Sequence, residues 1–72
     1  MRMTLRKLAV FVAVAQEGTV TRASETVQLT QSAASMALGD LEDALDSPLF
    51  DRLGKRLQLN DLGRYLLPQA LE

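Results

Sequence analysis

The sequence predicts a small, mainly α-helical domain that carries one short β-hairpin. Three observations favour this fold class. Apolar residues recur at spacings of three and four along most of the chain, as on the buried side of a helix. A stretch after Pro48 instead alternates between apolar and polar residues, which is typical of a half-buried strand. The length of 72 residues allows one small domain.

The first expected helix begins after Thr4, whose hydroxyl can cap it, and extends to about Glu17, where Gly18 is a typical stop signal. Its expected apolar stripe comprises Leu5, Leu8, Phe11, Val12 and Ala15, broadened by Val10 and Val14. A stripe this wide predicts a helix that packs on more than one side. Val20 is then expected to fill the space between this helix and the next.

The next two expected helices are joined by the short link of residues 28–30. Thr21 can cap a short helix that extends to Val27, and Thr30 can cap a longer helix that extends to about Leu45. The link is too short for the two helices to lie antiparallel. A short helix, a tight turn and a second helix form the helix-turn-helix pattern.

The longer of these helices has two distinct faces. Its expected buried residues are Ala34, Leu38, Leu41 and Leu45, and its opposite face carries Gln31, Ser32, Ser35, Met36 and Gly39. The residues of the opposite face are short or uncharged. Gln can bond an adenine edge, Ser can bond a base or a phosphate, and Met can contact a thymine methyl group. The same composition would also suit an ordinary solvated face.

The alternating stretch predicts two short strands, residues 49–52 and 55–59, around a turn at Leu53-Gly54. Pro48 cannot continue the preceding helix, so the hairpin begins after it. The cations of this hairpin are Arg52, Lys55 and Arg56. They would either contact DNA phosphates or form the solvated surface of a stabilising flap.

The last expected helix begins at Asn60, which can cap it, and Asp61 suits its first turn electrostatically. Pro68 predicts a kink or an early end. The apolar residues of this helix are Leu62, Leu66, Leu67 and Leu71. They offer more apolar surface than a helix needs to pack on one small domain, so a partner helix is expected.

Several spaced motifs together cover nearly the whole chain. They are Leu8-x-x-Phe11-x-x-Val14-Ala15-x-x-Gly18, Ala23, Gln31-Ser-Ala-Ala-Ser35, Leu38-x-x-Leu41-Glu42, Leu49-Phe50-Asp51-Arg52 and Asn60-x-x-Gly63. In this order and at this spacing, they resemble the N-terminal domain of LysR-type transcriptional regulators. The departures from the family pattern are Val20 for a larger Phe, Ser24 for Ala, Met36 for Arg or another long polar residue, Asp46 for Gly and Asn60 for Thr.

The resemblance implies a winged helix-turn-helix domain with a three-helix core, in which the hairpin is the wing. Residues 1–59 would form the DNA-binding domain, and residues 60–72 would form the truncated start of a linker and dimerisation helix. The implied contacts are Gln31, Ser32, Ser35 and Met36 with bases, Arg22, Thr30, Arg52, Lys55 and Arg56 with phosphates, and Leu62, Leu66, Leu67 and Leu71 with a second copy. The expected partners are double-stranded DNA and a second copy of the chain. A complete regulator would form a tetramer and bind a small-molecule effector in a C-terminal domain.

The composition excludes several classes of function. The chain contains no Cys and no His, which excludes disulfides, thiolate or imidazole metal sites and His-based catalytic triads. The carboxylates Asp40, Asp43 and Asp46 are expected on a solvated helix end with no partner base, so we expect no enzyme and no cofactor. No segment approaches the length of a membrane span, and no cleaved signal peptide is expected, so the chain is predicted to be cytoplasmic.

The net charge of −1 is unusual for a DNA-binding domain, which is ordinarily basic. Cations and anions are, however, segregated along the sequence, so a basic stripe can still face the phosphates. Two alternatives remain open at this point. The same fold could serve as a protein-interaction or dimerisation module with weak or no DNA binding, or as a winged domain of another regulator family, such as the molybdate-responsive type.

Overall fold

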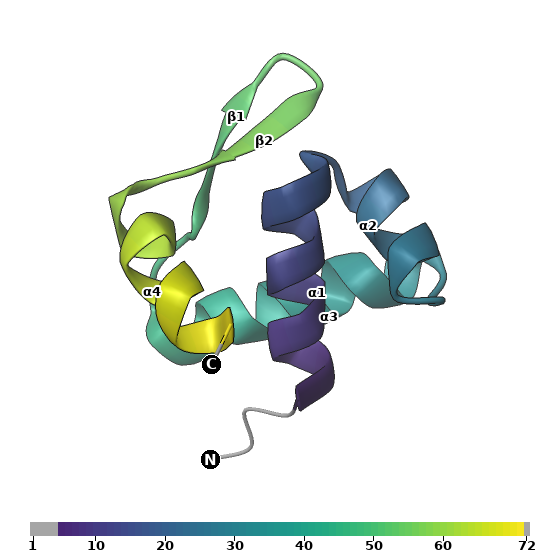
Figure 1. Cartoon of the computed structure of the whole chain (residues 1–72), viewed down its shortest axis with the longest axis horizontal. Helices are drawn as coiled ribbons and strands as arrows, with labels where there is room; N and C mark the ends of the chain where they lie inside the picture. Colours follow the sequence, from purple (N-terminus) through teal and green to yellow (C-terminus); the bar gives the residue numbers. More distant parts are fainter. Residues whose placement is uncertain (1–4, 72) are drawn as a thin grey trace.

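A computed structural model describes residues 5–71 of the chain. This part of the chain contains four helices and one antiparallel hairpin: α1 (Leu5–Glu17), α2 (Val20–Thr26), α3 (Gln31–Leu45), β1 (Phe50–Leu53), β2 (Arg56–Leu59) and α4 (Asp61–Leu71). Figure 1 shows α1 crossing α3, with α2 and α4 on opposite sides of α1 and the hairpin extending away from the helices. The predicted winged helix-turn-helix fold, mainly α-helical with a small hairpin, is confirmed.

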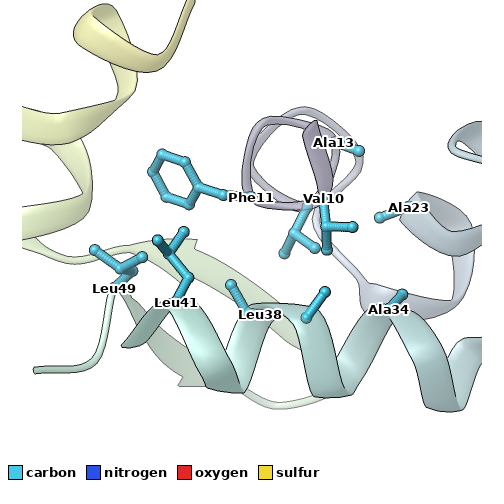
Figure 2. Packing of buried hydrophobic residues seen from close by; sticks show 10 residues of the cluster. Val10, Phe11, Ala13, Ala23, Ala34, Leu38, Leu41 and Leu49 are labelled. Carbon is cyan, nitrogen blue, oxygen red and sulfur yellow. The ribbon is translucent and has the colours of Figure 1, made fainter. Parts of the chain in front are cut away.

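The hydrophobic core lies between α1 and α3 and is closed by small residues at one end and large ones at the other (Figure 2). Ala23 of α2 and Ala34 of α3 are fully buried, and their short side chains let the three helices approach closely. At the other end, the ring of Phe11 lies 5.7 Å from that of Phe50, measured between centroids. This ring contact attaches the start of the hairpin to the helical core.

The apolar stripe expected for α1 is partly wrong. Val10, Val14 and Ala13 are buried, whereas Leu5 is 84% exposed. The reason is that α1 packs against α2, α3 and α4 together, so its buried side lies between these neighbours and is not centred on the leucines. The expectation that α1 packs on more than one side is confirmed. Its expected cap, Thr4, lies outside the described residues.

The helix α2 begins two residues earlier than predicted. Thr19, not Thr21, is its N-cap, and the Thr19 hydroxyl accepts a hydrogen bond from the N–H of Arg22 at 3.2 Å. Gly18 has a φ of 86°, which ends α1 and turns the chain sharply enough for the next helix to start at once. The predicted cap of α3 is confirmed, because the Thr30 hydroxyl accepts the N–H of Ala33 at 3.0 Å.

Two turns around α3 use left-handed residues that are not glycine. Gln28, in the turn between α2 and α3, has a φ of 60°, and Asp46, the C-cap of α3, has a φ of 55°. This conformation costs roughly 1–2 kcal/mol for a residue with a side chain, although Asn and Asp tolerate it better than most. It also explains why a glycine is usual at position 46 in the family pattern.

The hairpin turn is shifted by one residue from its predicted place. Pairing of Leu53 with Arg56 makes Gly54-Lys55 the two-residue loop, in place of the predicted Leu53-Gly54. The sequence prediction was wrong because the first residue of a two-residue hairpin loop needs a positive φ. Gly54, with a φ of 62°, adopts this conformation, whereas Leu53 would adopt it poorly. The predicted alternation of β2 is confirmed, since its two leucines are half-buried and its polar residues are exposed.

The start of α4 is fastened to the loop before β1 by Asn60. The Asn60 side-chain oxygen accepts the N–H of Gly63 at 2.8 Å, which confirms the predicted cap. The side-chain amide donates to the carbonyl of Pro48 at 2.9 Å, and the backbone N–H donates to that of Leu49 at 3.0 Å. A Thr at this position could form the cap but has no amide to reach Pro48.

The remaining predictions for α4 need correction. A kink or an early end was predicted at Pro68, and the early end is wrong, because the helix continues through Pro68 to Leu71. One lost hydrogen bond does not end a helix whose apolar side packs against the core. Leu62, Leu66 and Leu67 are half-buried in that packing, and this leaves less spare apolar surface than the sequence suggested. The apolar surface that remains consists mainly of Tyr65, 70% exposed, and Leu71, 57% exposed.

Candidate nucleic-acid interface

The structure brings the four candidate base-contacting residues together on the N-terminal half of α3. Gln31, Ser32, Ser35 and Met36 are all exposed and line one shallow hollow of about 530 Å³. Met36 has 68% of its surface exposed, so an apolar group stands at the edge of an otherwise polar face. The arrangement offers amide and hydroxyl groups that can both donate and accept hydrogen bonds.

Thr30 precedes this face at the N-terminus of α3. Its hydroxyl oxygen is occupied as an acceptor by the N–H of Ala33, but the residue as a whole is exposed. The first-turn N–H groups beside it lie at the positive end of the helix dipole. A phosphate at Thr30 would therefore be bound by backbone N–H groups more than by the hydroxyl.

A groove of about 310 Å³ separates α3 from the hairpin. Its walls include Ser35, Leu38 and Gly39 of α3 and Phe50, Arg52 and Leu57 of the hairpin. Arg52 pairs across the hairpin with Leu57, so its side chain leaves the strand on the face that looks toward the core and α3. This cation is therefore a direct neighbour of the polar face of α3.

The other two hairpin cations lie elsewhere. Lys55 is exposed in the turn, and Arg56 pairs with Leu53 on the opposite face from Arg52. The guanidinium of Arg56 lies over Gly18, where an added Cβ would stand only 2.4 Å from Nη2. Beside it, the N–H of Leu57 donates to the carbonyl of Gly18 at 2.8 Å. The sequence suggested one cluster, but the structure places Arg52 and Arg56 on opposite faces of the hairpin.

Arg22 lies on α2, apart from the hairpin, and its side chain is 72% exposed. Its Nε lies 3.7 Å from a carboxylate oxygen of Glu17, an exposed ion pair that water screens strongly. Arg22 can therefore exchange this partner for a phosphate at little cost.

Two of the acidic residues of α3, Asp40 and Glu42, have structural partners. Asp40 forms an ion pair with Lys7, with 3.8 Å between nitrogen and oxygen. The Glu42 carboxylate accepts the N–H of Leu49 at 2.8 Å, which fixes the entry into β1. These contacts explain part of the acidic balance of the chain, because the carboxylates stabilise the domain.

Sequence reasoning missed the left-handed backbone of Gln28, in the turn that precedes α3. This residue is exposed and lies only two residues before the α3 cap. The available signal was the absence of Gly from a turn that needs a positive φ, since some other residue then has to adopt it.

Residues 5–71 contain no metal-binding cluster of side chains and no membrane-spanning helix. No cluster of three or more acidic residues in this range could hold a metal ion. No helix in it is long and apolar enough to cross a membrane.

The fold and this surface define a winged helix-turn-helix protein. The model of a family described as bacterial regulatory helix-turn-helix protein, lysR family, matches residues 5–64. The chain belongs to the LysR family, as the spaced motifs of the sequence suggested. The relatives described next are transcriptional regulators, in agreement with the expectation that the chain is not an enzyme.

Two curated relatives are similar over most of this chain. The uncharacterized HTH-type transcriptional regulator YeiE of Escherichia coli K12 is 54% identical over 71 residues, which are 99% of this chain and 24% of that protein. The RuBisCO operon transcriptional regulator of Allochromatium vinosum is 47% identical over 64 residues, which are 89% of this chain and 21% of that protein. The chain thus spans less than a quarter of the length of these relatives.

Two solved structures with bound DNA have the same fold. The complex of the CbnR DNA-binding domain with DNA superposes with a TM-score of 0.88 at 26% identity, covering 94% of this chain and 78% of that one. Vibrio fischeri DarR in complex with DNA gives a TM-score of 0.91 at 28% identity, covering 99% of this chain and 24% of that one.

Proposed function

We propose that this chain binds double-stranded DNA sequence-specifically, as the N-terminal domain of a bacterial transcriptional regulator. The observation that carries the proposal is the exposed, uncharged face at the start of α3, next to a cation across a narrow groove. The two structural neighbours that contain DNA support it. The N-terminal half of α3 would enter the major groove, where an α-helix fits.

The face of α3 would read bases through a small set of side chains. Gln31 suits the paired donor and acceptor of an adenine, and Ser32 and Ser35 suit either a base or a phosphate. Met36 suits the methyl group of thymine. Its exposure supports this role, because a large apolar side chain gains stability from burial only when a partner covers it.

The phosphate contacts would be spread along the DNA. Thr30 and the start of α3 suit one phosphate, and Arg22 suits another on the side of α2. Arg52 and Arg56 leave opposite faces of the hairpin, so they would reach different parts of the duplex, and Lys55 would extend from the turn between the strands. With few cations and a net charge of −1, we expect modest affinity that falls steeply with salt.

We propose further that α4 pairs with its counterpart in a second copy of the chain. The exposed Tyr65 and Leu71 support this, together with the apolar edges of Leu62, Leu66 and Leu67. Sedimentation equilibrium of this chain, and of a version extended by the native downstream residues of its parent protein, tests it. The longer version should dimerise more tightly. If both versions remain monomeric across micromolar concentrations, the proposal is contradicted.

The parent protein would be longer than this chain, as its relatives are. We propose that it is a cytoplasmic regulator, tetrameric when complete, that binds a small-molecule effector through a C-terminal domain.

A protein-interaction module with weak DNA binding is the second candidate. Met36 in place of a cation and the acidic balance favour it. The molybdate-responsive alternative is set aside, because the chain belongs to the LysR family.

One experiment separates the two candidates. The chain is mixed with a labelled pool of random-sequence duplexes at low and at moderate salt, and the retained duplexes are sequenced. DNA binding predicts retention at low salt with enrichment of one motif. No retention at either salt would favour the interaction module.

A further inference from the structure

Gly39 is a glycine inside α3 that the fold itself does not require. A Cβ built on it would meet no atom within 4 Å. Gly63 is the opposite case, because a Cβ there would stand 2.3 Å from a backbone oxygen. Apart from proline, Gly is the least favourable residue for a helix interior. A residue that costs helical stability and fills no tight space within the domain indicates a requirement from outside it.

Gly39 lies where the two halves of the candidate interface meet. It is one turn beyond Ser35 on the exposed side of α3, and both residues line the groove shared with Arg52. Any longer side chain at position 39 would extend into this groove or over its rim.

The chemistry of the groove suits a sugar–phosphate backbone. Arg52 and the hydroxyl of Ser35 can bind a phosphate, and the apolar walls of Phe50, Leu57 and Leu38 can cover a deoxyribose. Among the described residues that line the groove, Arg52 is the cation and Glu42 is the anion, whose carboxylate accepts the N–H of Leu49. The groove is also continuous with the base-contacting face of α3 through Ser35.

We infer that Gly39 keeps α3 bare so that the backbone of one DNA strand can lie in the groove between α3 and β1, against Arg52. The inference rests on the proposed DNA binding and adds a positioning residue to it. Gly39 acts through the space above it, which sets how closely the strand approaches the guanidinium.

The test compares two substitutions at this position, Gly39→Ala and Gly39→Leu, with Ala44→Leu as a matched control. Ala44 is also exposed on α3 but lies outside the groove, so the control adds similar bulk elsewhere. The probe is a duplex that the unmodified chain selects from a random pool, together with a scrambled duplex. Thermal unfolding is followed by circular dichroism in parallel.

Both Gly39 variants should unfold at a higher temperature than the unmodified chain, because they remove a helix-interior glycine. Gly39→Leu should nevertheless lose affinity for both duplexes, by about tenfold or more. The slope of its log affinity against log salt concentration should be shallower by about 0.9, the value for one lost phosphate contact. The affinity of Gly39→Ala should lie between that of Gly39→Leu and that of the unmodified chain. Ala44→Leu should bind with the affinity of the unmodified chain. Opposite effects on stability and binding are what a merely structural glycine would not produce.

Arg52→Ala provides the second readout. It should weaken binding in the unmodified chain but add little in the Gly39→Leu background, since the strand can no longer reach the guanidinium there. Full DNA affinity of Gly39→Leu, or a lowered unfolding temperature of Gly39→Ala, would overturn the inference while leaving DNA binding intact. An unmodified chain that retains no duplex would instead contradict the proposed function, and the inference with it.

Discussion

Gly63→Ala should destabilise this domain far more than a single methyl group ordinarily does. The new Cβ would lie 2.3 Å from the carbonyl oxygen of Leu49 and 2.7 Å from a methyl carbon of Leu59, whereas ordinary contacts begin at 3.4 Å. The first obstacle is backbone, which cannot rotate away. The start of α4 would therefore have to move by about 1 Å from the loop before β1.

That movement acts on a site where several hydrogen bonds converge. Asn60 bonds Gly63, Pro48 and Leu49, at 2.8 to 3.0 Å, and Leu49 is fully buried. Overpacking costs about 1–3 kcal/mol, and each weakened hydrogen bond adds about 1 kcal/mol. The gain in helix propensity from Gly to Ala returns about 1 kcal/mol. We expect a net loss of about 2–4 kcal/mol, which is most of the stability of so small a domain.

Urea unfolding followed by circular dichroism measures this loss, with Gly39→Ala as the control. The control makes the same chemical change inside a helix, but into open space, and should raise the urea midpoint. A Gly63→Ala chain with the urea midpoint of the unmodified protein would refute the reasoning, because it would show that a Cβ at position 63 fits without steric overlap.

Three further predictions concern binding and one of the strained turns. Gln31→Ala and Ser35→Ala should each weaken binding to the selected duplex by about 1–3 kcal/mol without changing the unfolding temperature; equal losses on a scrambled duplex would show that they do not read sequence. Lys55→Ala combined with Arg56→Ala should weaken binding to all duplexes alike. The slope of log affinity against log salt concentration should become shallower by about 0.9 per lost phosphate contact, and an unchanged slope would show that the hairpin tip does not contact DNA. Asp46→Gly should raise the free energy of unfolding by about 1 kcal/mol, because Gly adopts a φ of 55° without strain and the change removes an anion from a helix C-terminus; a lower urea midpoint would count against this account.

The fold was largely predictable from the sequence because its signals are local. Thr30 and Asn60 cap their helices as expected. Helical spacing gave three of the four buried residues of α3, Ala34, Leu38 and Leu41, but it missed Ala37 and included Leu45, which is half-buried. The errors arose where two local signals compete. Thr19 and Thr21 are equally good caps in isolation, and only the turn at Gly18 decides between them.

The candidate site was predictable in its membership but not in its arrangement. Helical periodicity suffices to gather Gln31 and Ser35 on one face of α3. Strand alternation alone places Arg52 and Arg56 on opposite faces of the hairpin, but the position of Arg56 over Gly18 depends on how the hairpin packs against the end of α1. The open space over Gly39 is a property of the packed domain, and no local pattern in the sequence encodes it.

The hydrogen bonds from Asn60 to Pro48, Leu49 and Gly63 affect how the domain opens. They join α4 to the loop that leads into β1, and β2 ends at the residue before Asn60, so the hairpin and α4 share one junction. Fraying of α4 would release the loop that orients β1. Hydrogen exchange should then report the hairpin and α4 as one cooperative unit, distinct from the layer of α1 and α3. Shortening α4 at its far end would accordingly loosen Arg52, although that end lies remote from the hairpin in the sequence.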